Sequence, residues 1–257
     1  MTTGQVIISR RAIMTGLTSG AGLLLAGCPD HTLPPSYGNV LRMADNLTYR
    51  AQRLLLPRQA LAREYDRHDI TSIPAIGTTD PADPHGEFYD AAGGAAYERL
   101  RGGSFADWRL TIDGSVTRPG SYSLDELRRF PARTQITRHT CEEGWSAIAE
   151  WTGVPLRRVL EAAGVKPTAR FVNFYTFDGN LDSIDMFDAL HPQTILAYGM
   201  NGRELPIAHG APLRVRVERQ LGYKSLKFLH RISVTDEFYD PGKLGPLQNG
   251  WAWYVGI

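Results

Sequence analysis

The residue with the clearest chemical potential in this chain is Cys141, in the run Thr137-Arg138-His139-Thr140-Cys141-Glu142-Glu143-Gly144-Trp145-Ser146. The chain holds two cysteines, and the other, Cys28, ends an apolar N-terminal segment. Cys141 is therefore the only thiol in the body of the chain, where it has no partner for an intrachain disulfide. Its role must lie in packing or in reactivity.

Three interpretations of Cys141 follow from its neighbours. A hydrolytic nucleophile needs a base and an orienting group, and His139 is close in sequence, but Glu142 and Glu143 would raise the thiol pKa. An inert buried thiol is the second interpretation. In the third, a metal deprotonates the thiol outright. One thiolate cannot hold zinc or an iron–sulfur cluster, which need about four protein ligands, so it suits a metal whose other ligands arrive with a prosthetic group.

A second segment carries donors that suit a phosphate. It comprises His209-Gly210-Ala211-Pro212-Leu213-Arg214 and Gly222-Tyr223-Lys224-Ser225-Leu226-Lys227. Arg214, Lys224 and Lys227 can bind phosphate oxygens, and Gly222 would let the backbone approach a ligand closely. Basic residues along a strand also form ordinary solvated faces, so this segment alone does not settle the question.

The elements that must position these residues are mostly strands. Ser123-Leu124-Asp125-Glu126 is a capping box that starts a short helix to about Arg129, and Pro155 to Ala163 predicts another helix, ended by Gly164. Asn201-Gly202 predicts a type I′ hairpin turn. The predicted strands cover residues 108–114, 134–139, 171–177, 194–200, 203–207, 213–217 and 231–234. Many strands with few short helices predict a single, mixed and sheet-rich α+β domain.

Two segments before these strands are less regular. Leu54 to Glu64 predicts a short helix or a clamp. Thr71 to Gly103 is rich in Gly, Pro, Asp and Ala, which is typical of a long loop.

The N-terminal residues resemble an export signal. Arg10-Arg11 precede an uncharged stretch, Gly16 to Gly27, which is too short to cross a bilayer and suits a twin-arginine signal peptide. Leu25-Ala26-Gly27-Cys28 resembles a lipobox, which would place a lipid on Cys28. Ordinary cleavage, or an apolar helix that stays, are the alternatives. We expect residues 1–28 to be signal and lipobox, 29–53 a tether and 54–257 the functional domain.

The amino-acid composition limits the classes of partner that the chain could attract. Net charge is +1, from 28 Lys+Arg against 27 Asp+Glu, so no global field recruits nucleic acid or a membrane. Hydrophobic residues make up 42%, which supports a sizeable core. No second stretch is apolar enough to span a membrane.

Several ordered motifs resemble the sulfite oxidase family of molybdopterin-binding oxidoreductases, in its haem-free bacterial branch, which includes the periplasmic methionine sulfoxide reductase. Arg138 to Ser146 with Trp151-Thr152-Gly153-Val154-Pro155-Leu156 is similar to that family's molybdenum-binding segment. His191-Pro192-Gln193-Thr194 and the two segments at 209–214 and 222–227 are similar to its pterin-binding half, in the same order.

The resemblance implies a molybdenum centre carried by one molybdopterin, on the fold of that family. It implies that Cys141 is the protein ligand to the metal and that Glu143 manages protons beside it. The residues implied in pterin and phosphate binding are Thr176, His209, Arg214, Ser225, Leu226 and Lys227. His209 replaces an asparagine of the family. Arg63-Glu64-Tyr65 and Arg138 are weaker candidates, for a pterin clamp and an anion contact respectively.

The resemblance implies an exported, periplasmic or cell-envelope enzyme that moves an oxygen atom to or from a small S- or N-containing substrate. The chain has no His-Pro-Gly-Gly run of a cytochrome b5 module, so electrons are expected to pass to or from a separate haem or quinone-linked protein. The alternatives are a non-catalytic binding protein on the same fold and a cysteine-nucleophile hydrolase.

Overall fold

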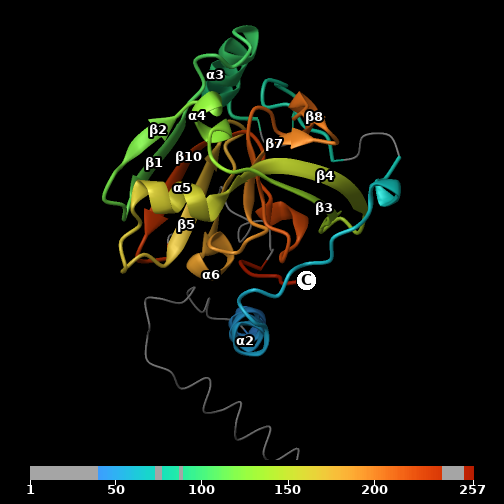
Figure 1. The fold of residues 1–257 in the computed structure, drawn as a ribbon, viewed down its shortest axis with the longest axis vertical. Coiled ribbons are helices and arrows are strands. Elements are labelled where there is room, and N and C mark those ends of the chain that lie inside the picture. Colours follow the sequence, from blue (N-terminus) through green and yellow to red (C-terminus); the bar gives the residue numbers. More distant parts are fainter. Residues whose placement is uncertain (1–39, 73–76, 87–88, 239–251) are drawn as a thin grey trace, which may run out of the picture.

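A computed structural model describes residues 40–72, 77–86, 89–238 and 252–257 (Figure 1). The predicted signal, the lipobox cysteine and residues 29–39 of the predicted tether lie outside these residues. Within the described part of the chain, no helix combines the length and apolarity needed to cross a bilayer.

Two five-stranded sheets form the body of the domain. The first has the order β2-β1-β10-β5-β6, and only its β1–β10 pair is parallel. Its strands are β1 (Leu110–Gly114), β2 (Gly120–Tyr122), β5 (Phe171–Thr176), β6 (Leu181–Asp185) and β10 (Leu229–Thr235). The last strand, β10, thus lies between β1 and β5 in the middle of this sheet.

The second sheet is antiparallel and carries most of the candidate site. Its order is β3-β4-β7-β8, with β9 also paired to β7. Its strands are β3 (Arg133–Thr140), β4 (Ser146–Pro155), β7 (Ile195–Met200), β8 (Arg203–Glu204) and β9 (Arg214–Arg216). Asn201 and Gly202 both have positive φ between β7 and β8, as a type I′ turn requires.

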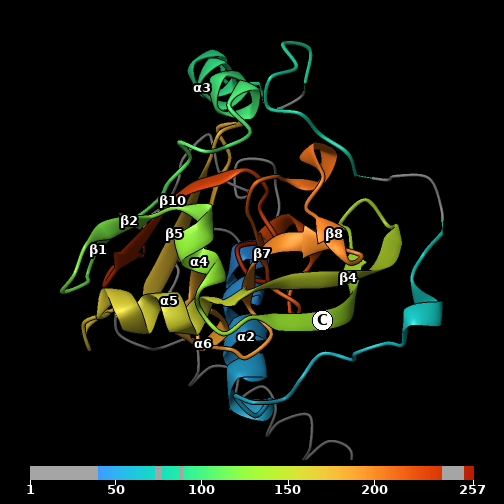
Figure 2. The same cartoon turned by 45° about the horizontal axis from the view of Figure 1, so that its top comes forward.

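Helices and 3₁₀ turns precede or connect the strands of the two sheets. The α-helices are α2 (Val40–Leu55), α3 (Ala91–Gly102), α4 (Leu124–Arg128), α5 (Leu156–Ala163) and α6 (Met186–Ala189), and three 3₁₀ turns are η1 (Arg67–Asp69), η2 (Ile207–His209) and η3 (Gly222–Lys224). Helices α2 and α3 lie at opposite ends of the molecule in both views (Figures 1 and 2).

The main core joins the two sheets. It contains Ile112, Val172 and Ile232 from the first sheet, Leu196 and Val215 from the second, and the buried face of α5 (Leu156, Val159, Leu160 and Ala163). This core fixes β9, and the turns that follow it, against the first sheet.

The predicted α+β class, the capping-box helix, the helix ended by Gly164 and the main strands are confirmed. The helix predicted within 54–64 is wrong beyond Leu55. Residues 57–60 instead form a turn, in which Ala60 N donates to Pro57 O at 3.1 Å. Residues 61–66 then run along the second sheet, where Gln193 bonds Ala62 and Glu64 forms a β-bridge with Thr137.

The long loop predicted over 71–103 is wrong at its end, where α3 forms behind an Asp90 N-cap that accepts from Gly93 N. Helix α2 occupies residues that we expected to be a tether.

Candidate functional site

Cys141 sits directly after β3, in a tight turn. Its backbone N donates to Trp145 O at 2.9 Å, and Gly144, with φ 90°, returns a bond to Cys141 O at 3.1 Å. The thiol is buried, and its Sγ lies 3.5 Å from Glu142 Oε2 and 3.6 Å from Glu143 Oε2. Burial, with added repulsion from the two carboxylates, raises the Cys141 pKa to about 12.

Glu143 lies beside this thiol as the resemblance implied. Its Oε2 accepts a 2.7 Å bond from Trp145 Nε1 while also facing Cys141 Sγ. The Glu143 side chain is exposed. A carboxylate held next to the thiol and open to solvent can exchange protons there.

His139 does not act as a base for Cys141. Its Nδ1 accepts a 2.6 Å bond from Arg216 Nη1, and burial together with Arg216, Arg214 and Lys227 lowers its pKa to about 2. A Cβ added at Gly222 would lie 2.4 Å from His139 Nε2. The absence of a side chain at Gly222 therefore makes room for the His139 ring; the close approach to a ligand stays a prediction.

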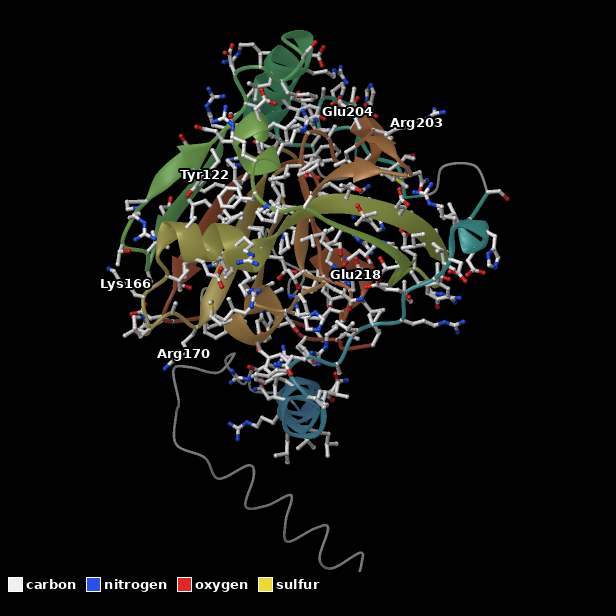
Figure 3. All side chains as sticks on the ribbon, viewed as in Figure 1. Tyr122, Lys166, Arg170, Arg203, Glu204 and Glu218 are labelled. Carbon is white, nitrogen blue, oxygen red and sulfur yellow. The ribbon has the colours of Figure 1, made fainter. Side chains whose placement is uncertain are left out.

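Arg214 is a buried guanidinium whose partners are carbonyls. It donates to His209 O at 3.0 Å and to Ser225 O at 2.7 Å, while its Nε is buried without a partner. Burial and the nearby Arg216 lower its pKa well below the ordinary value. Its neighbour Arg216 differs, because Glu218 neutralises it through two bonds of 3.0 and 2.8 Å. Glu218 is labelled in Figure 3, below β4 in that view.

Lys227 adds a second under-neutralised cation. Its Nζ donates to Gly77 O and, at 2.9 Å, to Thr79 Oγ1. Burial, with repulsion from Arg214, lowers its pKa to about 7. Among the described residues, neither Lys227 nor Arg214 forms an ion pair with a carboxylate.

The other predicted site residues surround these two cations. Burial and the charges of Arg214 and Lys227 lower the His209 pKa to about 4. Ser225 Oγ accepts from Val217 N at 3.1 Å, and Leu226 O accepts from Val215 N at 3.0 Å. Thr176 pairs with Leu229 across β5 and β10, and its hydroxyl donates to Asp178 and to Asn180 O.

The structure thus brings the predicted residues to one region, where β3, β5 and β9 end and the 222–227 loop begins. Lys227 lies between the Cys141 turn and the residues after β5. Cys141 and Glu143 from the turn and Asp178 from the other side each raise its pKa.

Lys224 is not a phosphate donor, contrary to our prediction. It is fully buried, and its Nζ donates to Asp182 Oδ1 at 2.7 Å and to Ser183 O at 3.0 Å. The weaker candidates also find other partners. The Arg138 guanidinium is exposed over the Tyr65 ring, and Glu64 bonds Arg133 and Gln193.

Two charged residues of this region, Arg216 and Asp178, were not among the predicted site residues. Arg216 lies two residues after Arg214, and the alternation of a strand puts both on one face, so that signal was available. Asp178 comes two residues after Thr176. Burial raises its pKa, and only the fold places it in reach of Lys227.

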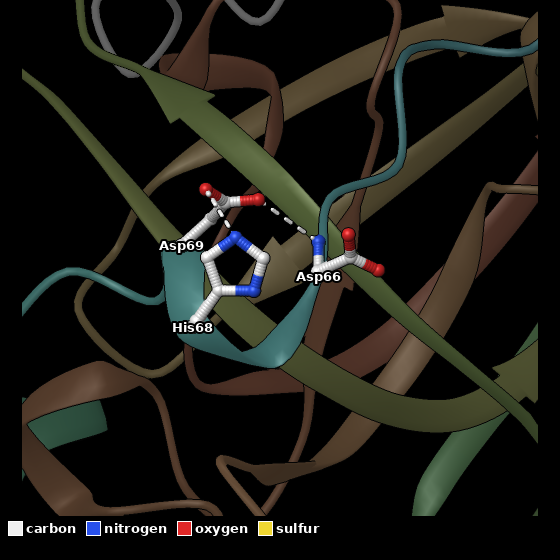
Figure 4. Close-up of side chains that lie close together, drawn as sticks. All are labelled: Asp66, His68 and Asp69. Carbon is white, nitrogen blue, oxygen red and sulfur yellow. Dashed lines mark hydrogen bonds and ion pairs between the residues drawn. The ribbon is translucent and has the colours of Figure 1, made fainter.

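One further group in the described ranges has ligand spacing for a metal. Asp66, His68 and Asp69 place their ligand atoms within 4.8 Å of one another, all exposed, on η1 (Figure 4). Asp69 Oδ2 accepts from Asp66 N at 3.0 Å, so these contacts cap the turn.

The residues fit a group that carries a metal at one end and an anion at the other. The Cys141 thiol ionises at ordinary pH only beside a strong positive charge. The buried Arg214 Nε and the Lys227 ammonium lack an anion, and a phosphate would supply it.

Comparison with known proteins points to the same chemistry. A family model described as "Oxidoreductase molybdopterin binding domain" matches residues 100–241. A putative protein-methionine-sulfoxide reductase subunit, YedZ1, from Azospira oryzae is 40% identical over 151 residues, which cover 59% of this chain and 56% of that protein. The protein-methionine-sulfoxide reductase catalytic subunit MsrP of Xanthomonas campestris is 29% identical over 92% of this chain and 73% of its own length.

Among solved structures, the sulfane dehydrogenase SoxCD from Paracoccus pantotrophus aligns with 51% of this chain and 39% of its own, at 28% identity and a TM-score of 0.49. The matched part of this chain spans 56% of the length of the Azospira oryzae relative.

Proposed function

Because the chain belongs to the oxidoreductase molybdopterin binding domain family, we propose that it is an exported molybdenum-dependent enzyme that transfers an oxygen atom to or from a small S- or N-containing substrate. The observation that carries the proposal is the proximity of a buried, hard-to-ionise thiol to two cations that form no ion pair among the described residues, the buried Arg214 and the half-buried Lys227. One cofactor with a metal at one end and a phosphate at the other would suit both features.

The proposed roles follow from the positions described above. Cys141 would be the thiolate ligand of the metal, and Glu143 would hold or release a proton beside it. Arg214 and Lys227, with the backbone of Ser225 and Leu226, would bind the phosphate end. Thr176 and His209 would contact the pterin between them. When bound, the metal supplies two-electron redox chemistry, and the protein supplies orientation and electrostatics.

The substrate class rests on the relatives. Two carry names of protein-methionine-sulfoxide reductase subunits, which favours reduction of an S-oxide over oxidation of sulfite. The word "subunit" in both names agrees with a separate electron-transfer protein, a haem or quinone-linked partner, as we predict for this chain.

The domain limits and the localisation also remain proposals. We assign residues 1–28 to a twin-arginine signal with a lipobox, 29–53 to a tether and 54–257 to the functional domain. Export by that route, to the periplasm or cell envelope, agrees with a cofactor that must be inserted before transport, and Cys28 would carry a lipid anchor.

Substitution of Cys141 by serine tests the metal assignment. We expect Cys141→Ser to retain its fold, to lose turnover, and to lose the thiolate-to-metal absorption band of the purified protein. Full activity with an unchanged band would contradict the assignment. A panel of methionine sulfoxide, sulfite and N-oxides, assayed with the wild type, identifies the substrate and the direction.

Elemental analysis separates the two rival functions. About one molybdenum per chain is expected after expression in a host that makes the cofactor, whereas a non-catalytic binding protein would contain none. A cysteine hydrolase would be active without metal and would be inactivated by thiol alkylation. The raised Cys141 pKa and the occupied His139 ring both oppose that function.

A further inference from the structure

An exposed group of leucines lies in the segment from Asn46 to Arg63, and none of them contributes to the candidate site described above. Nine large hydrophobic side chains are exposed among the described residues, and five of them are leucines of this segment. Leu54 and Leu55 are 84% and 76% exposed, and the other three are Leu47, Leu56 and Leu61. Such a concentration of exposed apolar surface marks an interaction site.

Leu54, Leu55 and Leu56 directly follow Arg53, which is bonded to the domain. Arg53 donates to Asp185 at 2.8 Å and to Asp188 at 2.7 Å, and all three side chains are largely buried. Tyr49 adds a 2.8 Å bond to Asp185. Helix α2 is therefore fixed to the domain through one face, and the leucines at its end project from a fixed element.

The same segment is basic. Between Asn46 and Arg63 there is no acidic residue, and four arginines are present. Arg53 is neutralised by its two aspartates, whereas Arg58 and Arg63 are exposed. Leucines beside exposed arginines match an anionic membrane surface, in which negatively charged headgroups cover an apolar acyl region.

We propose that the leucine–arginine face, defined as Leu47, Leu54, Leu55, Leu56 and Arg58 at the end of α2, docks on an anionic phospholipid surface. The leucines enter the headgroup boundary and Arg58 contacts a lipid phosphate. Helix α2 has 16 residues, fewer than the about 20 that span a bilayer, so it lies in the interface. The domain is then held against the membrane with α3 at its far end (Figures 1 and 2).

The predicted lipidation site is close to this face in sequence. Cys28 stands twelve positions before Val40, a distance of at most about 40 Å when extended. A lipid on Cys28, as we predict, would keep α2 within reach of the bilayer. The face itself depends on neither that lipid nor the cofactor, so its test is separate from that of the proposed function.

The test places a fluorescent label on the face. The full chain carries Cys28→Ser to remove lipidation and Leu55→Cys as the attachment point for an environment-sensitive dye. The buried Cys141 is controlled by the parent Cys28→Ser chain treated with the same dye. With vesicles of phosphatidylglycerol and phosphatidylethanolamine, nitroxide lipids are expected to quench the dye at position 55.

A matched chain with Tyr89→Cys controls for general proximity, because Tyr89 is exposed and lies two residues before α3, at the other end of the molecule. That label is expected to stay unquenched. Removing charge with Arg58→Gln is expected to weaken vesicle binding about fivefold, and neutral phosphatidylcholine vesicles should bind less.

Three outcomes would overturn the proposal. The first is no binding to anionic vesicles, and the second is binding with equal quenching at positions 55 and 89. The third is a dye shift without lipid that grows with protein concentration, which would mean that a second copy covers the leucines.

Discussion

Cys141 shows at the scale of one residue why the site needs an added positive charge. Burial and two carboxylates raise its pKa from 9.0 to about 12, which leaves about a thousandfold less thiolate near neutral pH. In cofactor-free protein, we therefore expect iodoacetamide at pH 8 to modify Cys141 about a thousandfold more slowly than in the urea-unfolded chain, measured by mass spectrometry of the peptide.

The neutral variants Glu142→Gln and Glu143→Gln check the electrostatic part of that prediction. Each removes one repulsive carboxylate and should lower the thiol pKa and speed modification, whereas simple shielding of the thiol would leave the rate unchanged. Rapid alkylation in the wild-type, metal-free protein would instead favour the hydrolase.

Gly222 is a residue-scale prediction about packing. A Cβ there would lie 2.4 Å from His139 Nε2 and 3.1 Å from Thr140 O. We expect Gly222→Ala to lower the free energy of unfolding by about 1–3 kcal/mol, as overpacking does, measured by urea denaturation. Gly120→Ala is the control, because nothing lies within 4 Å of its added Cβ. In a His139→Ala background the cost of Gly222→Ala should shrink.

The residue scale also shows what sequence reasoning cannot reach. Lys224 and Lys227 belong to one loop and are indistinguishable as phosphate donors in the sequence. Lys224 forms a buried ion pair with Asp182, which lies 42 residues earlier in the chain. No local sequence pattern predicts that pair. Arg214 was identified through its place in an ordered motif.

At the scale of elements, local signals were sufficient where they agreed with packing. The capping box at Ser123 and the left-handed Gly164 mark the helix boundaries as predicted. Helix α3 escaped prediction because it contains Gly93 and Gly94, which favour a loop. Both glycines are required by contacts distant in sequence, since an added Cβ would lie 2.1 Å from Phe177 O and 2.5 Å from Pro81 O respectively.

Helix α2 gives the element-scale prediction. Arg53→Met leaves Asp185 and Asp188 buried without their cation, which typically costs about 3–5 kcal/mol. We expect a loss of unfolding free energy of that size in urea denaturation. Arg128→Met, which breaks an exposed pair with Glu204, is the control and should cost at most about 1 kcal/mol. Equal losses in the two variants would mean that α2 is not held by these charges.

At the scale of the whole molecule, the bound cofactor would neutralise charges such as the Lys227 ammonium. The free energy of unfolding should therefore depend on pH differently with and without the cofactor. The folded Lys227 pKa is about 7, against 10.5 for an ordinary lysine. Between these values the unfolded chain binds a proton that the folded chain does not, and stability then rises with pH. The cofactor-free protein should therefore gain unfolding free energy between pH 7 and pH 9.

The loaded protein should lose most of that rise, because a bound phosphate would keep Lys227 protonated in the folded state and remove the difference in protons. Lys227→Met in the cofactor-free protein removes the titrating group and should flatten its profile, which separates Lys227 from Lys224, whose pKa is also lowered. Urea titrations at pH 7, 8 and 9 for the three samples measure this. A loaded protein that keeps the slope of the cofactor-free chain would mean that Lys227 does not meet the anion.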